Sequence, residues 1–334
     1  MAKTGGTQVT VGLGIESYAA PNVAVAETHF IQWADLSMQS VSEKALFTSA
    51  RGIRNTASNS MIKRRYSQGS VGFVPNVKNM PYALSLALGS VSSSTVSDSA
   101  YTHTFTVNNT NATPRTATFT VKEGSIETVQ YTNCVCDALA FEVSDEYAKC
   151  TLDLIGGFAG TDTVSESFSQ ETEFAYHQYT AKFGTSLSNA SGNSATPLKS
   201  FKLNIKNNVQ LDEAFLSGAN TISSGNLVNG RLEITGSYSL HFSDTTELAK
   251  YQANTKNAMI ITFTGALIGS SSLETIQFKL GKIVLTKEPV EYNIDGILVL
   301  NQEFTVEYDA TDLEMTAIVI NNVNNASTRV YDKA

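Results

Sequence analysis

The chain has 334 residues, of which 42% are hydrophobic and only 16% are charged, and it contains 16 Phe and 13 Tyr. Such a chain buries a sizeable core and is not intrinsically disordered, because disordered chains combine high net charge with few aromatic residues. The formal net charge of -8 argues against a protein that grips nucleic acid through its phosphates, since that requires a cationic surface.

Several short segments alternate apolar and polar residues, which predicts antiparallel strands with one face on a core and the other face polar. These segments are residues 119–122, 141–143, 150–154, 201–205, 278–280 and 304–308. No apolar run approaches the roughly 18 residues of a membrane span. The first residues lack the apolar core of a signal peptide, so we expect the chain to stay in the cell that makes it.

Two short helices are expected beside the strands. Residues 82–88 are mostly apolar, follow Asn79-Met-Pro81 and end before Gly89, which suits a proline in the first turn and a glycine stop. The run Asp244-Thr-Thr-Glu247 resembles the capping box of a second helix over the residues that follow it. The predicted fold class is therefore mainly β.

The order of these elements recurs along the chain, which indicates an internal duplication. Leu36-Ser-Met38 matches Leu203-Asn-Ile205 at a distance of 167 positions, and Gly69-Ser-Val71 matches Gly236-Ser-Tyr238 at the same distance. Asp137-Ala-Leu139 matches Asp295-Gly-Ile297 at 158 positions, as expected if the second copy has shorter loops. Chance similarity is the alternative, because any two β domains share alternation.

The duplication divides the chain into a first copy at residues 1–155, a linker and arm at residues 156–200, and a second copy at residues 201–334. The linker is rich in small polar residues, which bury too little surface to fold on their own. Residues 174–183 are the exception, because aromatic residues recur there. We expect them to pack as an edge strand or arm.

Each copy also contains a segment of about twenty residues that has no clear period, at residues 40–60 and 207–229. Loops of this length are uncommon in compact domains and usually have a function. Their isolated apolar side chains have no local strand to bury them, so we expect a partner surface to do so. The candidate interface residues are Leu46, Phe47, Arg51, Ile53, Arg54, Leu211, Phe215 and Leu216.

No motif in the sequence indicates catalysis. The four histidines are scattered without a nucleophile at a recognisable spacing, and the GxSxG, HExxH and P-loop patterns are absent. Cys134, Cys136 and Cys150 lack a fourth ligand for a soft metal site, so we interpret them as small buried hydrophobic residues. We therefore expect a protein that is not an enzyme and that needs no metal and no cofactor.

A series of motifs follows in order through the first 160 residues or so. It comprises Gly14-Ile-Glu16-Ser17-Tyr18, residues 30–37, Arg51-Gly52-Ile53-Arg54 and residues 69–73, 81–89, 101–105, 131–134 and 152–156. This series resembles the major tail tube proteins of long-tailed (siphovirus-type) bacteriophages. Ala19 and Ala20 depart from the family's opening motif, where glycine is more usual. The second half resembles the family mainly through the duplication.

The resemblance implies two tandem β-sandwich or half-barrel domains, each with one short helix and a long loop. In that family the inner sheets join around a ring, rings stack through the long loops, and DNA passes along the lumen without specific binding. A duplicated chain implies a ring of three subunits with pseudo-sixfold symmetry. The implied partners are further copies of the chain and the tape measure, terminator and distal tail proteins. The implied location is the virion tail, after synthesis in the bacterial cytoplasm.

The polar faces of the alternating strands are expected to line the lumen of such a tube. Glu142, Asp153 and Glu307 are the candidates, because their apolar neighbours along the chain share the opposite face. Carboxylates there would repel phosphates, whereas lysines would hold the DNA with an affinity that depends on salt.

Other classes of protein remain as alternatives. A capsid decoration protein or tail terminator would form a single ring or scattered trimers, without an extended polymer. A host-surface or carbohydrate-binding β module would need exposed aromatic residues, and the single tryptophan, Trp33, lies in a strand-like segment that suits a core. A hydrolase is a further class, which the missing nucleophile and base disfavour.

Overall fold

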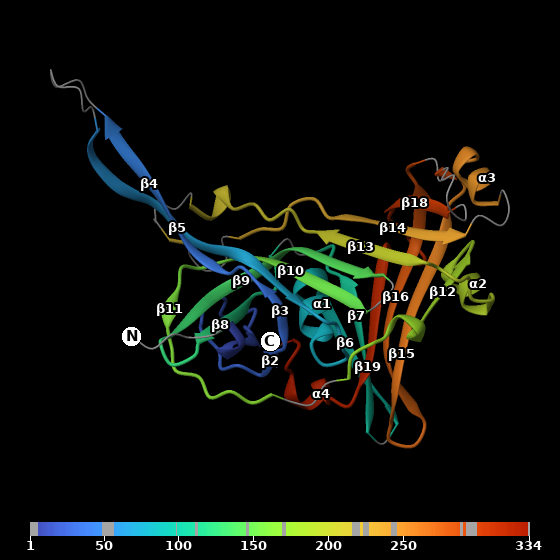
Figure 1. Cartoon of the computed structure of the whole chain (residues 1–334), viewed down its shortest axis with the longest axis horizontal. Helices are drawn as coiled ribbons and strands as arrows, with labels where there is room; N and C mark the ends of the chain where they lie inside the picture. The colour runs from blue at the N-terminus through green and yellow to red at the C-terminus, as the bar shows by residue number, and fades with distance from the viewer. Residues whose placement is uncertain are drawn as a thin grey trace.

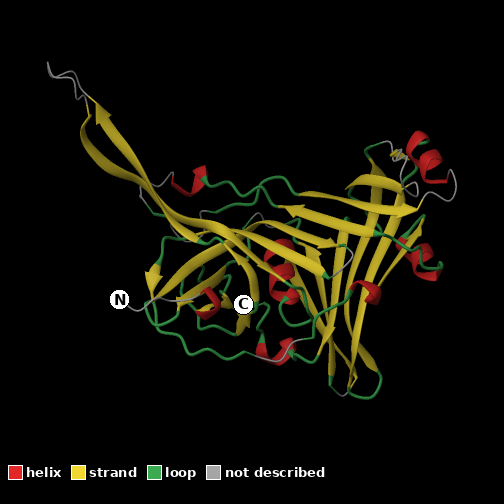
Figure 2. Cartoon of the chain, in the orientation of Figure 1, coloured by secondary structure: helices red, strands yellow, loops and turns green. Residues whose placement is uncertain are grey.

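The computed structural model consists mainly of antiparallel strands, as the sequence predicts (Figures 1 and 2). No helix in the described part of the chain is long and apolar enough to cross a membrane. The described residues are 6–48, 57–97, 99–110, 113–144, 147–168, 172–215, 221–222, 227–241, 246–287, 290–291 and 299–332.

A central sheet runs across the molecule and contains strands from both halves of the sequence (Figure 1). Every neighbouring pair in it is antiparallel, in the order β3–β5–β10–β9–β13–β14–β18–β16. These strands are β3 (Trp33–Leu36), β5 (Ala57–Phe73), β10 (Ala148–Gly156), β9 (Glu127–Val143), β13 (Ser200–Lys206), β14 (Glu233–His241), β18 (Val299–Val306) and β16 (Ser272–Leu285). The pairing of β9 with β13 joins the two halves.

Two flanking sheets extend from the long strands β9 and β16, each of which also belongs to the central sheet. The first contains β2, β1, β8, β9 and β11, and the second contains β12, β15, β16, β19, β7 and β6 in that order. The further strands are β1 (Val9–Ile15), β2 (His29–Ile31), β8 (Ala117–Glu123), β11 (Gly160–Thr161), β12 (Tyr179–Gly184), β15 (Asn257–Ile268), β19 (Met315–Asn321), β6 (Gly89–Ser97) and β7 (Ala100–Val107).

The pattern of strand pairing in the first half recurs in the second half. The pairs β1–β8, β8–β9, β9–β10, β10–β5, β5–β3 and β9–β11 have the counterparts β12–β15, β15–β16, β16–β18, β18–β14, β14–β13 and β16–β19. The hairpin of β6 and β7 has no counterpart among the described residues, and it joins the edge of the second flanking sheet at β19.

Helix α1 (Met80–Leu88) confirms the first predicted helix, and all of its residues are buried. Asn79 precedes it, Pro81 lies in its first turn, and Gly89 ends it with a φ of 86°, where its N–H donates to the Ser85 carbonyl. A left-handed φ of this kind favours glycine, which explains the stop. Helix α3 (Thr246–Gln252) is the second predicted helix, and the first part of its expected capping box lies outside the described residues.

One hydrophobic core joins the two halves. Phe141 of β9 contacts Phe263 of β15 and Phe278 of β16 in edge-to-face geometry, with ring centroids 5.4 and 4.9 Å apart. Aromatic pairs of this geometry add to the free energy gained by burying the rings. The halves therefore share buried surface, and the division at residues 155 and 201 is no gap in the packing.

The segment expected as a linker contains regular structure. Strand β12 pairs with β15 over six residues and with no other named strand in the described part of the chain, so an edge strand forms in the second part of residues 174–183. Tyr176–Gln178 form a short 3-10 helix before this strand. A short helix, α2 (Leu187–Gly192), follows it, with the Ser186 hydroxyl accepting from the Asn189 N–H at its start. The small polar residues there fold because β12 and β15 give them a surface to pack on.

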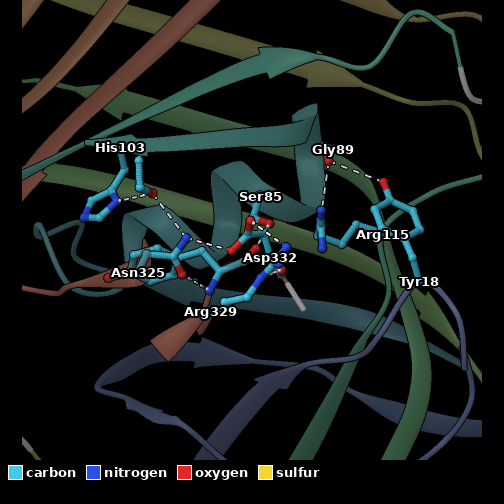
Figure 3. A network of polar contacts seen from close by, with 10 residues as sticks. Tyr18, Ser85, Gly89, His103, Arg115, Asn325, Arg329 and Asp332 are labelled. Carbon is cyan, nitrogen blue, oxygen red and sulfur yellow. Dashed lines mark hydrogen bonds and ion pairs between the residues drawn. The ribbon is translucent and has the colours of Figure 1, made fainter. Parts of the chain in front are cut away.

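The segment after β19 returns to α1 and packs against it (Figure 3). The Tyr331 side chain is buried, and the Ser85 hydroxyl of α1 donates to the Tyr331 carbonyl at 2.6 Å. Asn325, in the short helix α4 (Asn325–Thr328), accepts from the Tyr331 N–H at 2.8 Å through its side chain. The segment from Asn325 to Tyr331 thereby becomes part of the core around α1.

The motif Gly14-Ile-Glu16 also has a structural role. The Glu16 carboxylate is buried and accepts hydrogen bonds from the Asn22 N–H, the Thr118 hydroxyl and the Asn133 N–H, at 2.8, 2.9 and 2.8 Å. A buried carboxylate costs free energy unless it is hydrogen-bonded in this way. Glu16 thus holds three separate segments of the first half together.

Candidate interaction surfaces

A long two-stranded arm projects from the central sheet at the left of Figure 1. It is formed by β4 (Gln39–Thr48) and the first part of β5, in the region that the sequence suggests is a loop. Many residues of β4 are exposed, so no alternation of apolar and polar residues marks it as a strand. The segment of residues 40–60 is therefore a hairpin wherever the structure describes it.

The outer part of the arm exposes large apolar side chains. Leu46, Phe47 and Met61 are 68%, 46% and 57% exposed. Because Ala45 lies opposite Met61 in the register, Phe47 and Met61 lie on one face of the arm and Leu46 lies on the other. The candidates Arg51, Ile53 and Arg54 lie outside the described residues.

The described residues of the segment 207–229 pack along the base of the arm, so the apolar ones among them have a surface within the same chain. The Phe215 ring contacts Tyr66, with centroids 6.3 Å apart, and the Arg64 guanidinium lies 5.0 Å from its centroid. Arg64 also forms an ion pair of 2.5 Å with Asp212. Leu211 packs on the same cluster, and Leu216 lies outside the described residues.

The face of the central sheet that points away from the core carries rows of charged and neutral side chains. Strand register places Lys149, Glu142, Lys202, Ser237 and Glu303 in one row, which we call the first charged row. The next row, Thr151, Ala140, Asn204, Thr235 and Thr305, is neutral, and Asp153, Ala138, Lys206 and Glu233 form the second charged row. Glu142 and Asp153, which the sequence selects for a polar face, lie on this outward face.

The carboxylates of the outward face lie beside lysines. Lys202 Nζ is 2.8 Å from the Glu142 carboxylate, and Lys287 Nζ is 3.4 Å from that of Glu303. Glu307, which follows β18, pairs with Lys256 at 2.7 Å and with Lys282 at 3.2 Å. The lysines could not be paired with these carboxylates from the sequence, because the partners come from different strands.

The local environment shifts two of the candidate carboxyl groups in opposite directions. Burial, with Asp137 nearby, raises the pKa of Asp153, and Lys206 offsets part of that shift. The hydrogen bond from Lys256 lowers the pKa of Glu307, because it favours the charged carboxylate. In both groups, lysines from other strands or loops favour the charged carboxylate and lower its pKa.

The two ends of the central sheet have unpaired edges. Among the described residues, β3 pairs with β5 alone, and β17 (Val290–Glu291) pairs with β18 alone. Strand β17 continues the line of β16 along β18, since β18 pairs first with residues 283–285 and then with residues 290–291. Open edges of this kind offer unpaired backbone groups to another chain.

The described residues contain no group of three or more His, Cys, Asp or Glu side chains that could hold a metal ion. Cys134, Cys136 and Cys150 are buried free thiols, and burial raises the pKa of each. A raised pKa keeps a thiol protonated, so these cysteines are inert toward metals and oxidants.

Comparison with known proteins places the chain in a family. No curated protein matches it. The family model described as phage tail tube protein matches residues 6–307, which covers the central sheet, most of both flanking sheets and the arm. The mainly β fold and the exposed apolar arm suit a structural component of a virion tail. The chain belongs to the phage tail tube protein family.

Proposed function

We propose that this tail tube protein polymerises as stacked rings into a tube that conducts DNA during ejection from a long-tailed, siphovirus-type phage. In this role it is a structural homo-oligomer with no catalytic activity, made in the bacterial cytoplasm. Its further partners would be other tail proteins, which cap the tube or occupy its lumen. The junction of β9 with β13 carries the proposal, because strands from the two halves of the chain pair there within one sheet.

The recurring strand pairs support a chain with two copies of one domain. Strand β12 occupies in the second half the position that β1 occupies in the first, as the outer neighbour of β15 and of β8. We therefore place the start of the second copy near Tyr179, within the segment that the sequence suggests is a linker. The second copy then reaches β19, the counterpart of β11.

The junction within the chain serves as a template for the junction between chains. Strand β13 is the counterpart of β3, and β9 is the counterpart of β16 with β17, so the free edge of β3 in one chain suits the free edge of β16 and β17 in the next. Lys206 lies opposite Ala138 in the β9–β13 register. By the repeat, Gln39, at the start of β4 and paired with β5 as β3 is, takes the place of Lys206, and Val284 of β16 takes the place of Ala138. Gln39 of one chain would then lie opposite Val284 of the next chain, on the outward face.

Closing the sheet in this way yields a ring of domains. Two domains per chain give six domains from three chains, which is the ring that the duplication favours. Every edge of the central sheet would then be paired, and this removes the liability of open edges in a β protein. The contact is heterologous, with unlike edges meeting, and a heterologous contact closes into a ring when its rotation permits.

The arm is the surface that we assign to stacking between rings. It projects beyond the body of the chain (Figure 1). Phe47 and Met61 are exposed on one of its faces. Exposed apolar side chains on a projecting hairpin gain free energy when a neighbour covers them. A second copy in the adjacent ring is the neighbour that we propose.

Disulfide trapping tests the ring. Directly opposite residues in a sheet have Cβ atoms about 5 Å apart, which is close enough for a disulfide after a small shift. The double variant Gln39→Cys/Val284→Cys should form linked chains on oxidation, and the ladder on a non-reducing gel should end at three chains. The pair Gln39→Cys/Thr286→Cys, shifted by two residues, is the matched control. A ladder that reaches six chains would overturn the three-subunit ring, and equal linking in both pairs would overturn the register.

Electron microscopy of the purified chain tests polymerisation. Tubes are the expected result, whereas single rings favour a terminator or decoration role and monomers favour a binding module. The variant Phe47→Asp/Met61→Asp should still close rings in the trapping assay but fail to form tubes, because charged groups would occupy the stacking surface. Ser60→Asp, at an exposed polar position of the same arm, is the control and should form tubes.

A further inference from the structure

The outward face of the central sheet contains both signs of charge, although the whole chain has a net charge of -8. The first charged row alternates Lys149, Glu142 and Lys202 on three neighbouring strands, so Glu142 lies between two lysines. Lys202 is 2.8 Å from its carboxylate, and the two side chains are 57% and 44% exposed. A nucleic acid that approaches Lys202 therefore meets a lysine whose charge a carboxylate already balances.

The same arrangement recurs at the other charges of the face. Glu303 pairs with Lys287, and Glu307 pairs with both Lys256 and Lys282. Lys206 lies opposite Glu233 and also stabilises the charged form of Asp153. Between the charged rows, the neutral row presents uncharged side chains, which release no counterions from DNA.

We infer that the carboxylates of this face act as masks for its lysines, so that the face neither binds nor repels DNA strongly. This inference rests on the proposed function for its biological meaning, since it deepens the description of the surface that DNA would pass. The sequence alone suggests a carboxylate-lined surface that repels DNA. On the present inference each carboxylate acts by neutralising the lysine beside it, so that breaking a single ion pair raises the affinity of the face for DNA.

The physical argument concerns counterions. A lysine that contacts a phosphate releases condensed ions from DNA, and the gain depends on the lysine being available. A lysine held by a carboxylate must first give up that ion pair, and the carboxylate left beside it repels the phosphate. Removal of Glu142 should therefore uncover Lys202. It also removes the carboxylate opposite Lys149, whose Nζ lies 5.4 Å from the centroid of the Tyr147 ring.

The experiment measures binding of a short fluorescent DNA duplex to the full chain before assembly, by anisotropy at several salt concentrations. Wild type should bind weakly. Glu142→Gln should bind about tenfold more tightly at low salt, with a slope of log affinity against log salt steeper by roughly 1 to 2. Glu127→Gln makes the same change of net charge at an exposed position of the first flanking sheet, and it should bind as wild type does.

A third variant identifies the lysine. Glu142→Gln/Lys202→Gln should lose most of the gained affinity. The inference is overturned if Glu142→Gln binds DNA no better than wild type, or if Glu127→Gln gains as much as Glu142→Gln. Imaging of tubes is independent of this assay, so loss of the proposed function and loss of the masking inference give different results. If Glu142→Gln gains affinity for DNA but the wild-type chain forms no tubes, the masking inference stands and the proposed function is overturned.

Discussion

The ion pair of Lys202 with Glu142 spans the junction between β13 and β9, with 2.8 Å between Nζ and the carboxylate. The two residues come from different halves of the chain, and they lie directly opposite each other in the register. The pair therefore belongs both to the seam between the two halves and to the outward face. A partly exposed pair of this kind contributes little to stability, so its importance lies in what the face presents.

The first prediction concerns that stability. A double-mutant cycle of Glu142→Ala with Lys202→Ala should give a coupling free energy of about 0.5 kcal/mol, which falls as salt rises. Urea unfolding of the unassembled chain measures it. A coupling above about 2 kcal/mol would contradict the view that the pair acts on surface charge and contributes little to the seam.

The second prediction concerns the buried Glu16. Glu16→Ala should lower the free energy of unfolding by about 3 kcal/mol or more, because the Asn22 and Asn133 N–H groups and the Thr118 hydroxyl would lose their acceptor inside the protein. The exposed Glu127→Ala is the control and should change the free energy by less than about 0.5 kcal/mol. Equal effects of the two substitutions would mean that Glu16 does not hold the first half together.

The third prediction concerns pH. Burial, and secondarily the charge of Lys78, lowers the pKa of His29 to about 4 from its ordinary 6.5. The unfolded chain therefore takes up a proton as pH falls below 6.5, whereas the folded chain does so only near pH 4, and stability falls across that window. The loss attributable to this residue is about 3 kcal/mol. Well above pH 6.5 this loss of stability does not occur, because His29 is neutral in both the folded and the unfolded chain.

The test of this pH dependence uses a variant that keeps the packing. His29 stacks on Tyr82 with ring centroids 5.2 Å apart, and His29→Phe retains an aromatic ring there without a titrating group. The unfolding free energy of this variant should fall less steeply than that of wild type between pH 6.5 and pH 4. Parallel curves would show that another group is responsible.

The fourth prediction concerns the thiols. Because Cys134, Cys136 and Cys150 are buried, a thiol reagent should modify the folded chain only at its rate of unfolding. Ser144→Cys introduces a thiol at an exposed position after β9 and should react at once. Modification of the wild-type chain as fast as this control would contradict the burial.

The fifth prediction concerns DNA ejection. Asp153→Lys should preserve tubes and slow or block ejection, because it places a second cation beside Lys206 on the outward face. Glu307→Lys should act in the same way, since it would release Lys256 and Lys282. Phage infectivity and the length of DNA ejected measure the effect. Unchanged infectivity in both variants would place the outward face away from the DNA.

The sequence predicts those elements whose two faces differ. Cys150 to Leu154 alternates because one face is buried in the core and the other is exposed, and β10 forms there. The helix at Met80–Leu88 is predictable because its stop and its first turn depend on local residues, Gly89 and Pro81. Such signals come from within a few residues of the element itself.

The arm and the junction of β9 with β13 could not be predicted from the sequence, because neither depends on signals from neighbouring residues along the chain. Strand β4 is exposed along much of its length, and one of its half-buried positions holds Glu43, so its residues do not alternate between apolar and polar. The register of β9 with β13 joins residues that lie 58 to 68 positions apart in the sequence, and Lys202 meets Glu142 only through that register. The strand-pairing pattern makes β16 the counterpart of β9, so residues 137–139 correspond to residues 283–285. The sequence match of Asp137-Ala-Leu139 with Asp295-Gly-Ile297 falls on residues outside the described part of the chain.

The burial of Tyr331 has a consequence for the order of events in the infected cell. The ring lies among Tyr82, His103 and Phe105, all from the first half of the chain. Helix α1 and strand β7 are therefore synthesised long before the ring that packs between them. Fragments from translation that stops before Tyr331 lack that ring, so we expect them to keep a gap in the packing around α1 and to fold less stably.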